Sequence, residues 1–246
     1  MIDIGEIATL AAIAFLGALI FGITGFGAAL VTIPLATHFV PLQFALALFA
    51  LGDLAMAWSV GLENPRNAVR AEWLRLVPMI LAGTALGVTV LVNLPREAGM
   101  LLLGLFVLSF AVYSLLRRNA VKIISPYWGW VAGLVGGVTS TLFGAGGPPY
   151  AIYLSQRGLS KEQLRATMGF ATMTSISLRV IAFLITGLLL QAEVWIAALA
   201  VVPAAFIGIA VARLAFSRIS RDALLRAISV MLLASGASLV ARALTQ

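Results

Sequence analysis

The sequence contains no cysteine, a single histidine and few charged residues. Only 25 of its 246 residues are Lys, Arg, Asp or Glu, whereas 62% are hydrophobic. The missing cysteines exclude disulfides, thiolate metal sites and cysteine nucleophiles. So few charges cannot cover a soluble protein, in which about a quarter of the residues are charged. The chain is therefore predicted to be an all-α polytopic membrane protein.

The basic residues are not arranged for nucleic-acid binding. They outnumber the acidic residues by 16 to 9, but no basic run with interleaved aromatic residues lies in a segment polar enough to leave the membrane. The N-terminal segment carries Asp3 and Glu6 and no early Lys or Arg, so it lacks the basic region of a cleaved signal peptide. We expect it to be the first membrane segment.

Apolar stretches follow one another along the whole chain. They lie at 4–21, 28–40, 42–60, 74–94, 98–116, 127–142, 148–155, 166–187, 194–212 and 223–244. Several approach the roughly 20 residues that one bilayer crossing needs. The polar connectors are too short to hold a soluble domain, so we expect one transmembrane domain over residues 1–246.

A weak internal repeat divides the chain into two halves, at about 1–119 and 125–246. The segment GITGFGAALVTIP at 22–34 matches TLFGAGGPPYAIY at 141–153. An offset of 119 aligns two glycine pairs, Gly25 with Gly144 and Gly27 with Gly146. An offset of 125 aligns a proline and a glycine, Pro78 and Gly83 with Pro203 and Gly208. Such self-similarity is expected of an old duplication.

The positions of the basic residues distinguish two topologies, because cytoplasmic loops collect Lys and Arg. If each Gly-rich region belongs to a single crossing, the loops on each side carry seven basic residues. If each region is instead the turn of a hairpin that leaves and returns on one side, twelve basic residues are cytoplasmic. Only Arg96 and Arg242 then lie outside. The second topology is favoured.

The hairpin topology makes the halves inverted repeats, because corresponding loops have opposite charge. Each half would hold a Gly-rich broken or re-entrant hairpin followed by three transmembrane helices, with both termini outside the cytoplasm. The second arm of the later hairpin, 148–155, would reach only about 12 Å at 1.5 Å per residue. That is well short of a hydrocarbon core of about 30 Å, so we expect the broken helices to meet near its middle.

The paired breaks are the predicted substrate site, because irregular backbone at membrane depth must be buried or line a wet cavity. Helix starts offer free N–H groups and partial positive charge, which suit a small oxyanion. The candidate binding residues are Thr24, Gly25, Phe26, Gly27, Ala28, Ser140, Thr141, Gly144, Ala145, Gly146, Gly147 and Pro148. The alternatives are that the glycines only allow close helix packing and that the hydroxyls bond the carbonyl one turn back.

Two charged residues lie well inside the predicted spans. Arg179 is a candidate anion contact, and Asp53 is a candidate for coupling or gating through proton exchange. The alternative is that the two pair with each other to hold helices together. His38, at the outer end of the first hairpin, has a titration range that suits gating, but it also fits an interfacial polar residue. It has no second histidine or acidic cluster beside it, so neither a metal site nor a cofactor is expected.

The two glycine motifs, GITGFGAALVTIP and GLVGGVTSTLFGAGGPP, resemble those of the sulfite exporter TauE/SafE family. The resemblance extends over nearly the whole chain through the order of segments. It implies an inner-membrane permease for small sulfur-containing anions such as sulfite, thiosulfate or organosulfonates, often exported. Ala28 and Ala29 stand at positions that are commonly glycine in that family.

The sequence thus predicts a secondary transporter, in particular an exporter, that moves a small oxyanion by alternating access. Its expected partners are the anionic substrate and the lipid bilayer, with the choice between monomer and homo-oligomer left open. The alternatives are an anion channel of the same architecture, an intramembrane enzyme acting on lipid phosphates and a structural subunit of a larger assembly.

Overall fold

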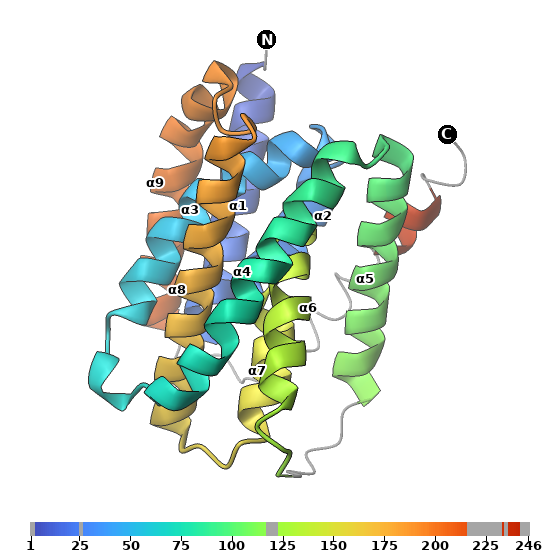
Figure 1. The fold of residues 1–246 in the computed structure, drawn as a ribbon. Coiled ribbons are helices and arrows are strands. Elements are labelled where there is room, and N and C mark those ends of the chain that lie inside the picture. The colour runs from blue at the N-terminus through green and yellow to red at the C-terminus, as the bar shows by residue number, and fades with distance from the viewer. Residues whose placement is uncertain (1–2, 25–26, 117–122, 216–232, 234–235, 242–246) are drawn as a thin grey trace.

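The computed structural model describes residues 3–24, 27–116, 123–215, 233 and 236–241, and the fold over these residues is all-helical. A short 3-10 turn lies at Pro65–Asn67. The labelled helices are α1 (Ile4–Thr24), α2 (Ala28–Ala36), α3 (Leu42–Gly61), α4 (Arg70–Asn93), α5 (Arg96–Leu116), α6 (Trp128–Phe143), α7 (Gly147–Ser155), α8 (Lys161–Ile185) and α9 (Ala192–Ala215). They form one elongated bundle (Figure 1).

Five of these helices are long and apolar enough to cross a membrane. They are α1, α3, α4, α8 and α9, and two shorter apolar segments are Glu97–Tyr113 within α5 and the whole of α6. The prediction of a multi-pass helical membrane protein is confirmed. The predicted span at 223–244 lies mostly outside the described residues.

The two remaining helices, α2 and α7, are short because glycine and proline interrupt the chain before them. Each has nine residues, which corresponds to about 14 Å. Gly27, before α2, has a φ of 90°, and Gly144, after α6, has a φ of 71°. Residues other than glycine rarely adopt this left-handed region of backbone conformation, so both turns depend on glycine. The predicted short second arms are present.

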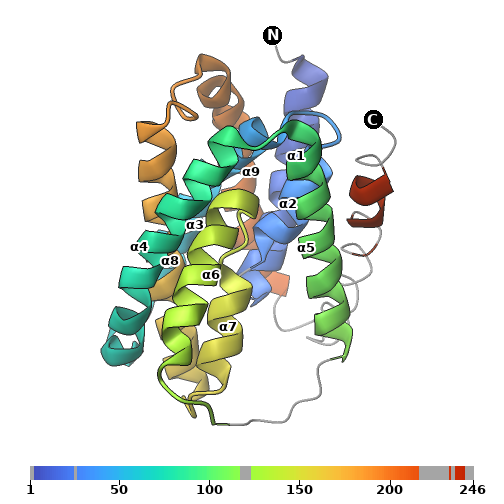
Figure 2. The ribbon, with the colours of Figure 1, turned by 45° about the vertical axis from the view of Figure 1, so that its right-hand side comes forward.

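Two long helix pairs make the most extensive contacts, α1 with α9 and α4 with α6, although each pair is distant in sequence. In both views α4 and α6 lie side by side (Figure 1, Figure 2). Glycines allow this close approach. A methyl group added to Gly83 would collide with the Leu134 carbonyl, and one added to Gly208 would come within 2.6 Å of the Phe15 carbonyl. Small residues at such crossings are typical of membrane helices.

Helices α3 and α8 pack against each other between these pairs. The start of α8 is defined by a capping box, in which the Ser160 hydroxyl accepts from the Gln163 N–H and the Gln163 side chain accepts from the Ser160 N–H. The centre of the bundle therefore consists of two well-defined helices, and the broken helices face them from either side. This arrangement brings Asp53 of α3 opposite Arg179 of α8.

Candidate functional site

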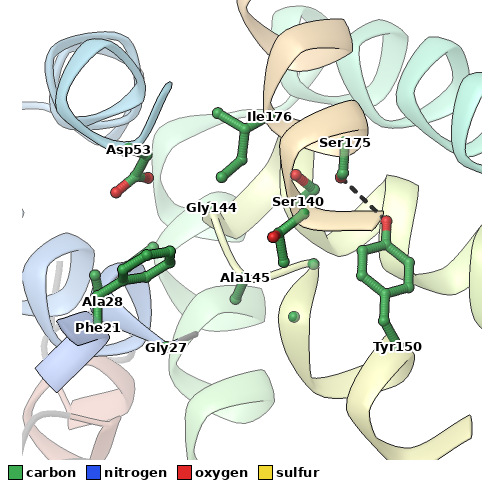
Figure 3. A pocket seen from close by; sticks show the side chains of 14 residues that line it. Phe21, Gly27, Ala28, Asp53, Ser140, Gly144, Ala145, Tyr150, Ser175 and Ile176 are labelled. Carbon is green, nitrogen blue, oxygen red and sulfur yellow. Dashed lines mark hydrogen bonds between the residues drawn. The ribbon is translucent and has the colours of Figure 1, made fainter. Parts of the chain in front are cut away.

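The two glycine breaks, which are distant in sequence, lie against each other in the fold. A methyl group on Gly144 would come within 2.7 Å of the Ala29 Cβ. Between the breaks is a cavity of about 30 Å³. Its lining comes from α1, the start of α2, α3, both sides of the second break, and α8: Phe21, Gly27, Ala28, Ala29, Asp53, Ser140, Gly144, Ala145, Gly146, Gly147, Tyr150, Thr172, Ser175 and Ile176 (Figure 3).

The starts of α2 and α7 both contribute to this lining. The first N–H groups of a helix have no partner within it and carry partial positive charge. In α7 the second and third positions are Pro148 and Pro149, which have no N–H, so Gly147 provides the amide at this helix start. In α2 the corresponding positions are Ala29 and Leu30, which have N–H groups, and that of Leu30 donates to the Gly27 carbonyl. Both helix starts therefore favour a negative charge in the cavity.

Arg179 lies directly behind the second break and is almost completely buried, at 1% exposure. Its Nη2 donates to the Asp53 Oδ2 at 2.7 Å, and its Nη1 donates to the Ser140 carbonyl at 3.1 Å. The Arg179 Nε has no hydrogen-bond partner among the described residues. The ion pair expected as one alternative is thus present, and it spans α3 and α8. A donor on the guanidinium remains unused.

Hydroxyl groups complete the polar side of the cavity. The Tyr150 hydroxyl donates to the Ser175 Oγ at 3.0 Å, which leaves the Ser175 proton for another acceptor (Figure 3). The Thr172 hydroxyl instead donates to the Met168 carbonyl at 2.9 Å. Ser140 also lines the cavity. The cavity thus combines backbone amides, hydroxyls and the Asp53 carboxylate, which the Arg179 guanidinium pairs from behind. The amides and hydroxyls can bind and release an anion without a covalent step.

Most predicted residues of the second motif come together in this cavity, but two do not. Ser140, Gly144, Ala145, Gly146 and Gly147 line it. The Thr141 hydroxyl donates to the Gly137 carbonyl at 2.9 Å, and this side chain packs against Gly87 of α4. Pro148 fills the first turn of α7 and is not part of the lining. For Thr141, the alternative of bonding one turn back therefore describes the structure.

The first motif contributes Gly27 and Ala28 to the cavity. Thr24 is the last residue of α1, and its side chain is outside the described set, as are Gly25 and Phe26. His38 lies away from the cavity, in the turn after α2. Its ring nitrogens contact the Pro34 carbonyl at 2.9 Å and the Ser238 Oγ at 3.1 Å.

The sequence did not point to several of the lining residues: Phe21, Ala29, Tyr150, Thr172, Ser175 and Ile176. A helical pattern could have found two of them. Thr172 and Ser175 precede Arg179 by seven and four residues, so all three lie on one face of α8. A polar stripe on an otherwise apolar helix indicates a face turned toward a partner or a cavity.

A second charged group, also unpredicted, holds the end of α7. Glu72 of α4 is buried, and its Oε1 accepts from Arg157 at 3.0 Å while its Oε2 accepts from Arg75 at 2.8 Å. The Tyr153 hydroxyl of α7 also donates to Glu72. The sequence signal that could have indicated this network is an acidic residue, Glu72, within the basic connector after α3. This Glu72 network ties α4, α7 and the turn after α7 together.

A multi-pass helical protein whose two broken helices meet at a polar cavity has the architecture of a membrane transporter. The family model for the sulfite exporter TauE/SafE matches residues 10–239. The chain therefore belongs to the sulfite exporter TauE/SafE family of membrane transporters.

A curated relative supports the assignment. The "Probable inner membrane transporter protein TsaS" of Comamonas testosteroni is 26% identical over 166 residues, which cover 67% of this chain and 69% of the relative. No solved structure matches the chain. Because the family consists of transporters, the alternative of an intramembrane enzyme is wrong.

Proposed function

We propose that the protein exports a small sulfur-containing oxyanion, such as sulfite or an organosulfonate, across the inner membrane. The anion binds in the cavity between the two breaks and moves by alternating access. The main observation behind this proposal is that two helix starts meet at one cavity, and that a buried arginine behind it is paired with the lining residue Asp53. The helix starts favour negative charge there, and Arg179 adds to this when Asp53 is protonated. The inner-membrane setting follows the name of the Comamonas relative.

The size of the cavity favours a small substrate. At about 30 Å³, it has room for only a few atoms unless its walls move. The walls that could move are the first turns of α2 and α7, which are short and follow glycines. A small oxyanion with its charge spread over several oxygens can accept from the Gly147 amide and the Ser175 hydroxyl at the same time.

Alternating access would follow from an inverted repeat, and the helix packing supports one. At the offset of 125, Gly83 of α4 corresponds to Gly208 of α9. At the offset of 119, their contacts Leu134 and Gly137 correspond to Phe15 and Ala18. Two equivalent glycines thus pack on two equivalent pairs of residues. The repeats are then residues 1–119 and 125–246, related by an axis between α3 and α8.

The placement of Lys and Arg gives the orientation, with both termini outside the cytoplasm. The chain has no native cysteine, so single cysteines can be introduced without removing others. Labelling of a cysteine beside Glu63 and of one beside Gln191 by an impermeant reagent tests this. The first should react only from the cytoplasmic side and the second only from outside.

Arg179 and Asp53 would couple the anion to a proton. The anion competes with the Asp53 carboxylate for the Arg179 guanidinium, so binding is favoured when Asp53 takes a proton. The anion and the proton would then be bound together while the site is closed to both sides of the membrane, and their charges would balance. A role for His38 in gating and the formation of a homo-oligomer stay predictions.

The experiment that tests the proposed function is flux in liposomes that contain only the purified protein. Sulfite, thiosulfate, sulfate and methanesulfonate are supplied at matched and at unequal pH. A transporter predicts saturable flux of at least one anion that a proton gradient can drive. Flux that rises linearly with concentration and ignores the proton gradient would indicate the channel instead. Absence of flux in the purified protein would favour a subunit of a larger assembly.

A further inference from the structure

A second, smaller cavity lies on the other side of Asp53, between α1, α2, α3 and α9. Its volume is about 10 Å³, close to the minimum that one water molecule needs. Asp53 and Ala28 line both cavities, so they form the partition between them. The rest of the second lining is apolar, for example Phe49 and Val201, except for Thr32.

Thr32, which lines this cavity, has an unpaired hydroxyl. The residue is 2% exposed, and its Oγ1 has no hydrogen-bond partner among the described residues. Other buried threonines of the bundle, such as Thr141 and Thr172, donate to a carbonyl one turn back. A buried hydroxyl without a partner costs about 1–3 kcal/mol unless a water molecule satisfies it. The Thr32 hydroxyl therefore lacks a polar partner within the described part of the chain, and a water molecule would supply one.

We propose that this second cavity holds a water molecule, bound by the Thr32 hydroxyl, that carries protons to and from the Asp53 carboxylate. The inference rests on the proposed function, in which Asp53 takes a proton when the anion binds. A hydronium ion in the cavity transfers one proton to a carboxylate oxygen of Asp53, leaving water and a neutral carboxylic acid. The reverse step returns the proton to the water. Thr32 is a positioning residue in this scheme.

The surroundings of Asp53 leave this side as the route for the proton. Among the described residues, the charged or titratable groups that face it are Arg179 from α8 and, across the first cavity, the Tyr150 phenol from α7. The anion would occupy that first cavity. Helices α1, α2 and α9 present only uncharged groups at the second cavity. The proton and the anion thus approach Asp53 from opposite sides.

The test replaces Thr32 and a matched control threonine. Thr32→Val keeps the shape and removes the hydroxyl, whereas Thr32→Ser keeps the hydroxyl. The control is Thr84→Val, because Thr84 is also buried with an unpaired Oγ1 but lines neither cavity. Purified variants in liposomes are supplied with thiosulfate and methanesulfonate, which carry no proton near neutral pH. Anion flux and proton flux are followed in the same sample.

The expected result is a loss of coupling that depends on the Thr32 hydroxyl. Thr32→Val should lower proton-driven anion accumulation by about tenfold, the effect of losing one good hydrogen bond. Thr32→Ser should restore it, and Thr84→Val should match the wild type. Anion-exchange flux at equal pH, which needs no net proton transfer, should be retained in all three, which shows that they are folded.

Three outcomes would overturn the inference, and the first two differ in what they say about the proposed function. Wild-type flux that a proton gradient drives, with Thr32→Val behaving like wild type, contradicts the role of Thr32 and leaves the proposed function standing. Wild-type flux that no proton gradient drives contradicts both the coupling role of Asp53 and the inference. Equal losses in Thr32→Val and Thr84→Val would also overturn it, because the effect would then belong to buried threonines in general.

Discussion

The two broken hairpins of this protein correspond in sequence but differ in how their short helices are held. Around α7 the space is filled by Tyr150 and Tyr153, which are fully or nearly buried. Around α2, Val31 stands at the position equivalent to Tyr150 at the offset of 119, and a cavity remains beside Thr32. The Glu72 network fixes the end of α7, whereas the turn after α2 has His38 at the position equivalent to Arg157.

This difference indicates a division of roles. The second hairpin is a firmly held wall that contributes six of the fourteen residues lining the first cavity, more than the first hairpin does. The first hairpin has free volume, and its short helix contains Pro34. Rigid elements position ligands, and less densely packed elements are the ones that open. We expect α2 to move more than α7 during transport.

The largest effect is expected at the ion pair that joins the two halves. Arg179→Lys keeps the charge but loses the fork that reaches both Asp53 and the Ser140 carbonyl. Anion flux in liposomes should fall by about 100-fold or more. The control is Arg165→Lys on the same helix, whose ion pair with Glu63 is largely exposed and should matter little. Equal flux in both variants would mean that Arg179 does not take part in anion transport.

The next largest loss of flux is expected when a glycine at a break is replaced by alanine. The same replacement in both hairpins compares them directly. An alanine at either glycine must adopt the left-handed region, but at Gly144 it also collides with Ala29, whereas at Gly27 the nearest described side chain is Leu30, at 3.7 Å. Gly144→Ala should reduce flux by about 30-fold and Gly27→Ala by about fivefold, the latter if strain alone costs about 1 kcal/mol.

The control for strain is Gly158→Ala, because Gly158 also has a positive φ, of 68°, but nothing lies within 4 Å of the added methyl. Its flux should be close to that of wild type, with only a loss of stability. If Gly158→Ala and Gly144→Ala lose the same flux, the close contact between the two breaks is unimportant for transport.

The sequence alone predicted the helical membrane fold, the two short arms and the cluster of glycines, because these depend on local signals. Apolar length sets a span, and glycine and proline set a break. Arg179 and Asp53 were found because charges inside spans are rare. Tyr150, Ser175 and the Glu72 network were missed because their roles depend on which helices become neighbours.

The Glu72 network is predicted to stabilise the fold more than an exposed ion pair at the same end of the bundle does. Glu72→Gln removes the carboxylate that accepts from Arg75, Arg157 and Tyr153, so the free energy of unfolding should drop by about 2 kcal/mol. Glu63→Gln, at an exposed ion pair, should cost less than about 1 kcal/mol. Thermal unfolding in detergent measures both. A Glu72→Gln variant as stable as Glu63→Gln would mean that the network does not fix α7.

The smallest effect is expected for Tyr150→Phe. The ring still fills its space, but the hydrogen bond to Ser175 is lost, so the Ser175 hydroxyl is no longer oriented toward the cavity. Anion affinity should weaken by about five- to tenfold, equivalent to roughly 1 kcal/mol. Tyr127→Phe is the control, because Tyr127 is exposed. An unchanged affinity in Tyr150→Phe, measured by calorimetry, would show that Ser175 does not contact the anion.

The most direct test of the central claim is to locate a bound anion. Selenite resembles sulfite, and its selenium scatters X-rays anomalously, so crystals of the protein grown with selenite would give its position. We expect one anomalous peak in the cavity between Ala28 and Gly147, on the side of Ser175, and we expect Arg179→Lys to lose it. A peak elsewhere in the bundle, or none at a selenite concentration that saturates flux, would contradict a site between the two breaks.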